Sequence, residues 1–587
     1  MNRKRPIFVL FELLSRMPRK YKYKSIFSLL IMILNSFAEL ISLSLILPFL
    51  LILTSPKDIV NYKIIIFFSS FFKIDDPSQL ILIISILFIL SCLLTALIRI
   101  FNLYFVTQLA ASIGNHFAYE SFRRMLYQDY MVHINTNTSE LIANITLNVS
   151  RTVLIINQLF LLFTSIFIGT GIIIGLLIVN YKITISSLFV FSAAYVFIAL
   201  LTKKKLSKNS KIITESSELQ IRSLQEGLGS IRDIMINSSY GYFLKIFNKS
   251  DKSLRLSLAE NQVIAGFPRY AIESLGIILI VILSLNFKGN SESLNVIPLL
   301  GTLAFASQKL IPLIQQIYTS FSNIRAYSSS LFNVMDLVYK KINSKNYECL
   351  NKSKIFTKDI ELKNVNFRYV NEKPLILKNV NLKIYKGQSV GIIGQTGSGK
   401  STLIDILMGL LEPSSGEFFI DNKQLYKENS ISNLRSIVSH VPQSVFLSDG
   451  TFLENIAFGI EKSKIDYERV INVSKKACLL EVIESSANGF ETKVGERGMK
   501  LSGGQRQRIG IARALYRKSE ILFLDEATSA LDINTERKLI NNINSLGYEI
   551  TIIIIAHRLS TLKLCDNIFE VKDGNVVKNN YSQIKIK

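Results

Sequence analysis

The chain has 587 residues, of which 49% are hydrophobic, and a formal net charge of +24. A soluble protein of this length is seldom so apolar, and the excess is confined to the sequence before about Leu313. The charge is explained by Lys and Arg on cytoplasmic surfaces beside anionic lipid. A nucleic-acid partner is not expected, because no basic segment interleaved with aromatic residues occurs.

Six segments are apolar over about 20 residues, the length that a membrane-spanning helix needs. They cover residues 25–53, 79–101, 153–179, 183–201, 264–285 and 296–317. A large helical core in a soluble protein is the alternative. Residues 80–94 argue against it, because they contain no charge at all. The first half is therefore predicted to be a six-span membrane domain.

Charge between the spans sets the orientation. Residues 1–24 are strongly basic, whereas the links after the third and fifth spans each carry one lysine, Lys182 and Lys288. Since the loops of membrane proteins that are rich in Lys and Arg lie on the cytoplasmic side, the N-terminus and the second half are predicted to be cytoplasmic. Residues 102–152 and 202–263 are long, helix-compatible cytoplasmic links. The predicted domains are an N-terminal segment (1–24), a membrane domain (25–320), a linker (321–359) and a C-terminal domain (360–587).

The first motif of the C-terminal domain is a phosphate-binding loop. A short buried-strand pattern, residues 390–393, runs into the loop, and an apolar helix pattern over residues 402–411 follows. Its glycines let backbone amides face phosphate oxygens, and the helix N-terminus adds its positive end. We expect the lysine to reach the β- and γ-phosphates and the serine after it to bind Mg²⁺. The nucleotide-binding candidates here are Gly394, Gln395, Thr396, Gly397, Ser398, Gly399, Lys400, Ser401 and Thr402.

A second buried-strand pattern, residues 521–524, ends in Asp525 and Glu526. Next to a phosphate loop, such a pair is expected to supply a Mg²⁺-side carboxylate, Asp525, and a general base, Glu526. The alternative is a solvated acidic pair at a strand end, which would be preferred if the phosphate loop were missing.

Between these two motifs stands the segment 501–505, Leu-Ser-Gly-Gly-Gln, which we name the signature. With it, the second half resembles the ATPases of ABC transporters. The resemblance implies bound ATP and Mg²⁺, and a signature (Ser502, Gly503, Gly504, Gln505) that contacts the γ-phosphate of ATP held by another subunit. It also implies further roles: adenine stacking for Tyr369, Mg²⁺ and water contacts for Gln443, interface crossing for residues 529–532, and a γ-phosphate contact for His557.

The six apolar segments and the resemblance together predict an α-helical six-span membrane domain followed by an α/β P-loop ATPase. One chain holds a single ATPase domain whose site needs two, so a homodimer is implied. Two other classes fit the sequence less well. Soluble ABC ATPases that act as clamps carry no membrane spans, and a receptor with an inactive ATPase would not be expected to keep Glu526 and His557.

Fusion of the spans upstream of the ATPase is similar to the exporters of this superfamily, as is the segment 494–498 before the signature. Residues 130–135, followed by 139–141, and residues 225–229 resemble the two segments that couple the membrane helices to the ATPase. Ordinary helix-turn surface is the alternative for both.

Three cations, Arg99, Arg269 and Lys309, fall within the spans, with the acids Glu39 and Glu273 in the same inner half of the bilayer. Arg269 and Glu273 are four residues apart and could neutralise each other. One cation would still be unmatched, which favours a cargo lipid with an anionic headgroup.

Residues 137–144, 268–270 and 309–312 resemble bacterial lipid-linked oligosaccharide flippases of the inner (plasma) membrane. This predicts a polyprenyl-diphosphate oligosaccharide as cargo, with another lipid, a hydrophobic drug or a peptide as the alternative. Residues 54–78 are apolar but too short to span, and are predicted to lie as a helix on the outer face or to pack on the first two spans.

Overall fold

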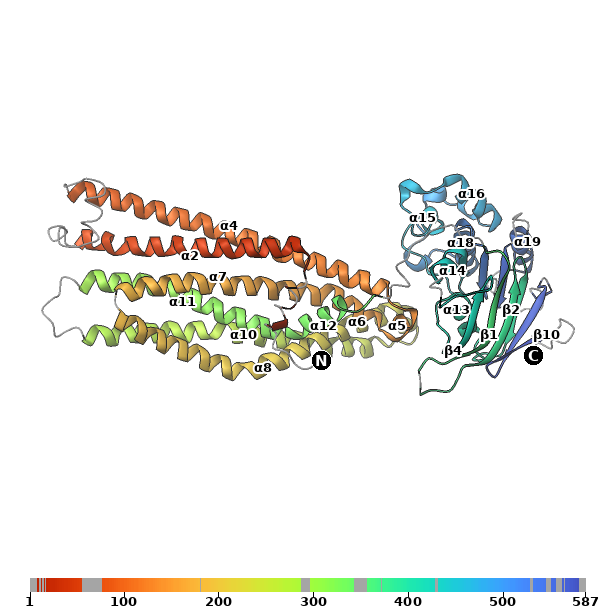
Figure 1. The fold of residues 1–587 in the computed structure, drawn as a ribbon, viewed down its shortest axis with the longest axis horizontal. Coiled ribbons are helices and arrows are strands. Elements are labelled where there is room, and N and C mark those ends of the chain that lie inside the picture. Colours follow the sequence, from red (N-terminus) through yellow and green to blue (C-terminus); the bar gives the residue numbers. More distant parts are fainter. Residues whose placement is uncertain are drawn as a thin grey trace. The chain divides into compact units, whose positions relative to one another are not determined.

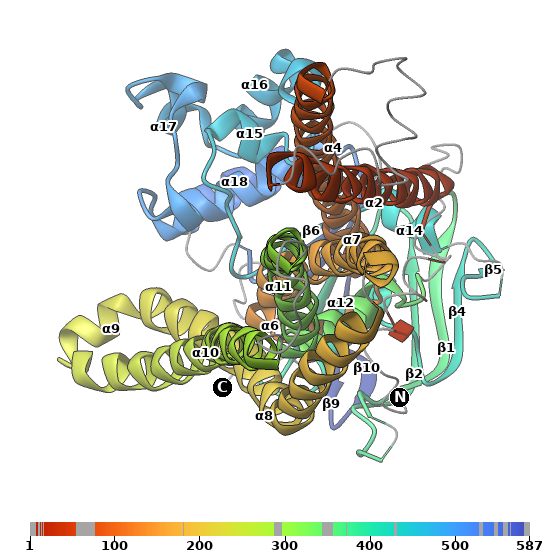
Figure 2. The same ribbon diagram turned by 90° about the vertical axis from the view of Figure 1, so that its left-hand side faces the viewer.

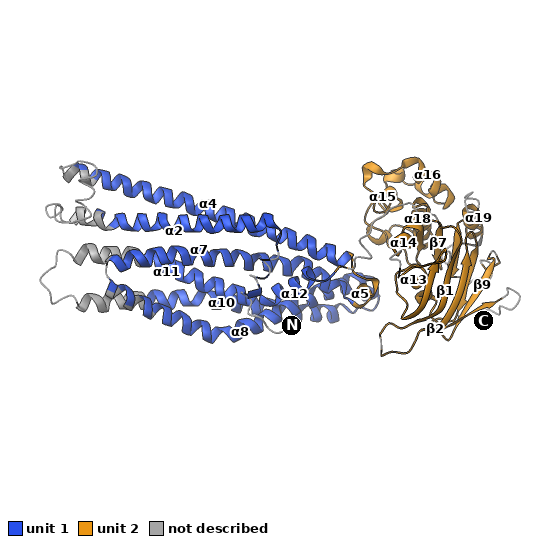
Figure 3. Ribbon diagram, viewed as in Figure 1, with its two compact units in different colours: residues 1–126, 136–341 blue, residues 127–135, 342–587 orange. Residues whose placement is uncertain are grey.

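The computed structural model of the chain describes residues 17–54, 77–179, 181–286, 296–342, 356–370, 372–427, 431–527, 532–544, 550–555, 562–563 and 565–579, with a few positions before residue 17. The chain divides into two compact units (Figure 3). The first contains residues 1–126 and 136–341, and the second contains residues 127–135 and 342–587. The second unit therefore includes a short segment from the first half of the sequence.

Long helices build the first unit (Figures 1 and 2): α2 (Arg19–Thr54), α4 (Pro77–Leu126), α7 (Val149–Val179), α8 (Tyr181–Gly229), α10 (Tyr240–Asn286) and α11 (Val296–Ala326). At about 1.5 Å per residue, the 50 residues of α4 extend over about 75 Å. The hydrocarbon core of a bilayer is only about 30 Å thick. Helices of this length continue past the membrane, as the long predicted links require.

The helices pack in a defined set of pairs. α2 contacts α4 and α7, α7 contacts α11, and α8 contacts α10. Met32, Ile113, Ile155 and Leu331 are fully buried in one apolar cluster of this unit. Large apolar side chains on the outside, such as Leu97, are more than half exposed, which suits helices surrounded by lipid.

Within the described residues, three stretches are long and apolar enough to cross a membrane: Arg19–Ile46, Leu82–Leu126 and Thr138–Ile178. The other three predicted spans coincide with parts of α8, α10 and α11. Helices thus stand at all six positions, and the count of six spans stays a prediction. The predicted outer helix at 54–78 falls almost entirely outside the described residues.

Short helices form the turns of the long cytoplasmic links. In the first link, α5 (Tyr130–Asn135) is followed by α6 (Thr138–Ala143) and a π-helical turn, η2 (Asn144–Asn148). In the second link, the predicted coupling segment 225–229 lies in the last turns of α8, and the short helix is α9 (Ile231–Ile236) instead. Arg222 pairs with Glu226 at 2.8 Å on these last turns of α8. The coupling role of residues 225–229 stays a prediction.

After α12 (Ser328–Val338), the second unit contains two sheets. The antiparallel sheet has the order β2-β1-β4-β5, and the larger sheet has the order β10-β9-β3-β8-β7-β6. Their strands are β1 (Asp359–Phe367), β2 (Leu377–Tyr385), β3 (Ser389–Gly394), β4 (Ser415–Ile420), β5 (Lys423–Gln424), β6 (Val438–Val441), β7 (Ile521–Asp525), β8 (Thr551–Ile555), β9 (Asn567–Lys572) and β10 (Asn575–Asn579).

All neighbours in the larger sheet are parallel except β9 and β10. Every residue of β8 is buried, as expected for a parallel strand covered on both faces. The helices of this unit are α13 (Lys400–Leu407), α14 (Ile431–Ile437), α15 (Phe452–Ile456), α16 (Tyr467–Lys476), α17 (Leu480–Glu484), α18 (Gly503–Tyr516) and α19 (Ile533–Asn544).

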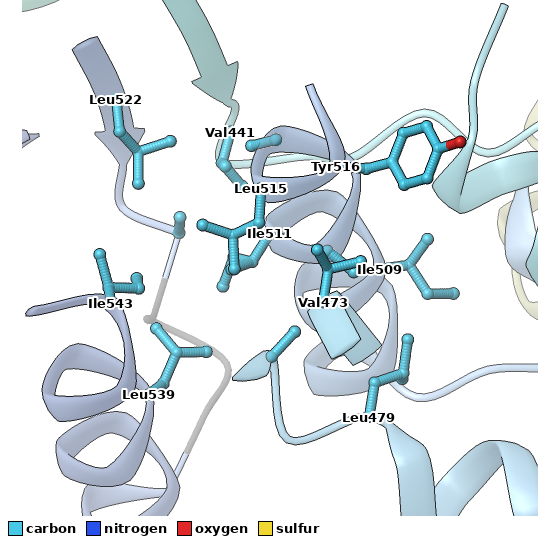
Figure 4. Packing of buried hydrophobic residues seen from close by; sticks show 14 of the residues in the cluster. Val441, Val473, Leu479, Ile509, Ile511, Leu515, Tyr516, Leu522, Leu539 and Ile543 are labelled. Carbon is cyan, nitrogen blue, oxygen red and sulfur yellow. The ribbon is translucent and has the colours of Figure 1, made fainter. Parts of the chain in front are cut away.

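Two apolar cores hold the second unit together. One surrounds α18, whose Ile509, Ile511 and Leu515 pack with Val473 of α16 and Leu539 of α19 (Figure 4). The other joins the antiparallel sheet, β3 and α13. The predicted fold class, a helical membrane domain followed by an α/β P-loop domain, is confirmed.

Candidate functional site

The phosphate-binding loop joins the carboxyl end of β3 to the start of α13, as the sequence predicts. Gly394, Gly397 and Gly399 have φ values of +148°, +81° and +107°, which residues with a Cβ atom rarely adopt. A Cβ on Gly394 would also collide with the carbonyl oxygen of Val571. Glycine is therefore required by the backbone path, and the loop ends on the helix N-terminus that favours an anion.

Lys400 folds back over this loop. Its ammonium donates hydrogen bonds to the carbonyl oxygens of Gly394 at 2.7 Å and Gln395 at 2.9 Å. Burial lowers the pKa of Lys400, while the carboxylates of Glu526 and Asp525 raise it. A phosphate group beside Lys400 would add another charge that favours the ammonium form.

The acidic pair lies at the same edge of the sheet as the loop. Because β3, β8 and β7 run parallel, their carboxyl ends meet there. Asp525 ends β7, and Glu526 follows with a φ of +47° while its N–H donates to the carbonyl oxygen of Ile555 at 3.3 Å. Positive φ in a residue with a side chain is uncommon, and such strained positions cluster at functional sites.

Glu526 is held by a residue from a distant segment. The amide nitrogen of Gln443 donates to Oε2 of Glu526 at 2.7 Å, across 83 positions of sequence. Gln443 follows β6, the strand next to β7. The structure thus brings together two residues that the sequence analysis chose for separate reasons.

A pocket of about 550 Å³ collects nine of the residues predicted for the ATP site. It is lined by Ile376, Thr396, Gly397, Gly399, Lys400, Ser401, Thr402, Gln443, Asp525, Glu526 and Ile555. Ile376 and Ile555 were not predicted, because no local sequence motif marks the apolar wall of the pocket. Gly394, Gln395 and Ser398 belong to the same loop, and the Ser398 hydroxyl is buried without a hydrogen-bond partner.

Tyr369 stands beside this pocket. Its hydroxyl lies 3.2 Å from that of Thr402 in the first turn of α13, and its ring packs edge-on against Phe367 with ring centroids 5.0 Å apart. An aromatic ring fixed next to the phosphate loop is suited to stacking on a flat base.

Asp405 of α13 is a further residue that the sequence did not reveal. Burial, with a smaller contribution from Asp525, raises its pKa to about 6. A negative charge at Asp525 and the apolar surroundings of α13 both disfavour the carboxylate of Asp405.

The signature forms the start of α18. Ser502 and Gln505 make reciprocal hydrogen bonds between side chain and backbone, at 3.2 Å and 2.8 Å, so Ser502 caps the helix. Gly503 and Gly504 are its first two residues. None of these four residues is among those that line the pocket at the phosphate loop.

The remaining predicted positions are only partly described. His557 and residues 529–531 lie outside the described part of the chain. Asp532 is described, and its carboxylate accepts hydrogen bonds from the N–H groups of Asn534 at 3.1 Å and Thr535 at 2.9 Å. A hydrogen bond with the Thr535 side chain lowers the pKa of Asp532 most, and the backbone bond from Thr535 lowers it further.

Comparison with known proteins agrees with this geometry. Residues 377–529 match the family model described as ABC transporter. An export ATP-binding/permease protein of Rickettsia typhi is 31% identical over 513 residues, which cover 84% of this chain and 85% of that protein. The chain belongs to the ABC transporter family. It is an exporter half-transporter whose ATPase domain binds and hydrolyses ATP to drive transport.

Two further matches bear on this exporter. The ATP-dependent lipid A-core flippase of Photobacterium profundum is 31% identical over 402 residues, covering 67% of this chain and 66% of that protein. The solved structure of a bacterial Atm1-family ABC exporter with ATP bound superposes with a TM-score of 0.76 at 20% identity, covering 96% of this chain and 95% of that one. The second match shows the shared fold of the whole half-transporter.

The membrane helices of the exporter carry the three predicted cations in two groups. Arg269 pairs with Glu273 one turn along α10 at 2.7 Å, with the two side chains 63% and 42% exposed. Arg99 of α4 and Lys309 of α11 both contact Glu39 of α2, at 2.5 Å and 2.8 Å. The pairing of Arg269 with Glu273 that the sequence allowed is present, and the other two cations share one carboxylate.

Proposed function

We propose that two copies of this half-transporter form an inner-membrane flippase that uses ATP and Mg²⁺ to move an amphipathic lipid with an anionic headgroup. The ATPase domains would lie in the cytoplasm. The proposed cargo is a polyprenyl-diphosphate-linked oligosaccharide. The observation that carries the cargo proposal is the group Arg99, Glu39 and Lys309, which joins three membrane helices and holds more positive than negative charge.

At the ATP site, Lys400 and the loop amides would hold the phosphates, and Tyr369 would stack on adenine. The hydroxyl of Ser401, the carboxylate of Asp525 and the amide oxygen of Gln443 offer the hard oxygen ligands that Mg²⁺ prefers. Bound Mg²⁺ would neutralise charge on the phosphates.

Glu526 would take a proton from the attacking water, and the bond from Gln443 at 2.7 Å orients its carboxylate. We assign His557 to the γ-phosphate, as the family resemblance implies.

A second copy is needed because the pocket has no lining residue from the signature. Ser502, Gly503, Gly504 and Gln505 would contact the γ-phosphate of ATP held by the partner, using the free N–H groups at the start of α18. Apolar side chains that a partner would cover are exposed in each unit, among them Ile236 in α9, 74% exposed, and Phe446, 64% exposed.

Mixed dimers test the shared site. Lys400→Ala damages the phosphate loop and Ser502→Arg damages the signature, so each homodimer has two faulty sites. A mixed dimer of the two variants keeps one intact site, made from the unaltered loop of one chain and the unaltered signature of the other. We expect one trapped ATP in each mixed dimer and none in either homodimer. A mixed dimer that traps no ATP, like both homodimers, would show that the loop and the signature of one site come from the same chain.

Charge in the membrane favours the anionic cargo over a neutral drug or peptide. A cation inside a bilayer is costly and is usually functional, and a diphosphate pairs well with Arg and Lys. The named lipid A-core flippase among the relatives supports a lipid cargo. The runner-up remains another lipid, a hydrophobic drug or a peptide.

The cargo proposal is tested by ATPase stimulation in nanodiscs with added polyprenyl diphosphate. Lys309→Ala and Arg99→Ala should lose stimulation and keep basal ATPase activity. Arg269→Ala should have a weaker effect, because Arg269 has a carboxylate of its own in Glu273, whereas Arg99 and Lys309 share one. Lys211→Ala, an exposed lysine beyond the apolar part of α8, is the matched control. Unchanged stimulation in the Arg99 and Lys309 variants would remove the cargo proposal.

A further inference from the structure

Glu39 is the most deeply buried charge among the described membrane-helix residues that form ion pairs. Its side chain is 1% exposed, and its two oxygens contact different helices: Oε1 meets the guanidinium of Arg99 on α4 and Oε2 meets the ammonium of Lys309 on α11. Lys309 also lies 3.5 Å from the hydroxyl of Ser42, one turn beyond Glu39. One carboxylate from α2 therefore occupies both cations of the group.

This arrangement differs from the ion pair within the predicted fifth span. Arg269 and Glu273 stand on one helix, and both are substantially exposed. Losing Glu273 would free a single accessible cation. Losing Glu39 would leave two cations, 44% and 20% exposed, without the carboxylate that bridges them.

A cationic site in this part of a membrane protein faces a competition problem. The cytoplasmic leaflet is rich in anionic phospholipid, whose phosphodiester carries one negative charge. Those lipids would vastly outnumber any special cargo, and a pair of unoccupied cations would attract them first. Specificity then requires an element that acts against the wrong ligand as well as contacts that favour the right one.

Glu39 supplies such an element. A headgroup that binds Arg99 and Lys309 must displace a carboxylate that already contacts both, and breaking a buried ion pair leaves an uncompensated charge, which is strongly unfavourable. A phosphodiester replaces the single negative charge of Glu39 with a single negative charge of its own, so its binding is favoured little. A diphosphate diester offers two charges on neighbouring phosphorus atoms and can engage both cations at once.

We propose that Glu39 is a specificity-determining residue that makes the Arg99 and Lys309 site reject headgroups with one negative charge and accept those with two. This rests on the proposed function, because it assumes that the site receives a lipid headgroup. Glu39 competes with any headgroup for Arg99 and Lys309. Because its carboxylate bridges these two cations of α4 and α11, a ligand must carry more than one negative charge to displace it.

The test uses full-length exporter in nanodiscs of phosphatidylcholine with a photoactivatable phosphatidylglycerol. Crosslinked peptides are mapped by mass spectrometry around Arg99 and Lys309. Wild-type protein should give little label there. Glu39→Gln, which keeps the size and polarity of the side chain, should raise that label by at least about tenfold, the change that 1.4 kcal/mol of binding makes.

Glu273→Gln is the matched control, since it removes the same charge from the other ion pair. It should leave the label around Arg99 and Lys309 at the wild-type level. Equal label in Glu39→Gln and wild type, or an equal rise in Glu273→Gln, would overturn the proposal. If Glu39→Gln does not fold, judged by size-exclusion elution, the wild-type arm still decides: strong phosphatidylglycerol labelling at these peptides refutes the exclusion, and its absence beside label elsewhere supports it.

A polyprenyl diphosphate competition arm separates this proposal from the proposed function. If Glu39→Gln gains phosphatidylglycerol but polyprenyl diphosphate neither binds nor stimulates wild type, the role of Glu39 in rejecting single charges stands and the cargo assignment fails. If polyprenyl diphosphate stimulates wild type while the labelling of Glu39→Gln is unchanged, the cargo stands and the role of Glu39 is refuted.

Discussion

Replacing Glu526 by Gln isolates the general base. Gln has the same size, and its amide oxygen can still accept the hydrogen bond that Gln443 donates at 2.7 Å, so the pocket should keep its shape. It cannot take a proton from water. Removing a general base usually slows a reaction about 10²–10⁴-fold, which corresponds to about 2.7–5.5 kcal/mol of barrier. Hydrolysis should fall by this factor while ATP binding persists.

Phosphate release and binding of labelled ATP are measured on the same purified dimer. The control is Glu484→Gln, the same chemical change at an exposed position of α17. Glu484→Gln should hydrolyse ATP at the wild-type rate. Near wild-type turnover in Glu526→Gln would refute the assignment of the base, and loss of both binding and hydrolysis would show that Glu526 shapes the site.

Three further changes have defined outcomes. Lys400→Ala should weaken ATP binding itself by at least about tenfold, since a charge-assisted contact to phosphate contributes about 1.5–3 kcal/mol; unchanged affinity in a filter-binding assay would contradict this role. Ser502→Arg should block hydrolysis while each chain still binds ATP, because a bulky cation replaces the hydroxyl that caps α18; normal phosphate release would show that the signature does not meet the nucleotide. Asp405 has a folded-state pKa of about 6, above its ordinary 3.8, so its charged form destabilises the fold above pH 6 and this cost fades as the pH falls towards 4. Asp405→Asn should therefore raise the melting temperature at pH 8. The gain in stability should be below about 3 kcal/mol, because solvent screens this partly exposed group. Circular dichroism melts at pH 8 and pH 4.5 should show a smaller gain at the lower pH, and an equal gain at both would contradict the raised pKa of Asp405 as its cause.

The ATP site could be predicted in detail because its motifs are local. A glycine pattern between a strand and a helix fixes the backbone of the phosphate loop, and parallel strands bring their carboxyl ends to one edge. Asp525 and Lys400 therefore line one pocket, although 125 positions separate them. The apolar wall of that pocket and the burial of Asp405 depend on how the two sheets and α13 pack, which no local pattern shows.

In the membrane helices, sequence spacing predicted the ion pair within one helix but could not predict the ion pairs between different helices. The interval of four residues indicated the pairing of Arg269 with Glu273. The contacts of Glu39 depend on how α2, α4 and α11 are rotated about their axes, and Lys309 lies 270 positions away in sequence. The sequence therefore predicted one unmatched cation but not that two cations share one carboxylate. In the second link, α8 continues through the predicted coupling segment to Gly229, which no local pattern in the sequence indicated.

Transport itself tests the central claim most directly. Purified exporter is reconstituted into proteoliposomes with a fluorescent polyprenyl-diphosphate oligosaccharide, and the fraction of label that becomes accessible to a membrane-impermeant quencher is followed after ATP and Mg²⁺ are added. We predict ATP-dependent movement in the wild type, none in Glu526→Gln, and loss of movement with retained basal ATPase in Lys309→Ala. Movement that proceeds without ATP, or that is as fast in Lys309→Ala as in the wild type, would contradict an ATP-driven flippase with a charged headgroup site.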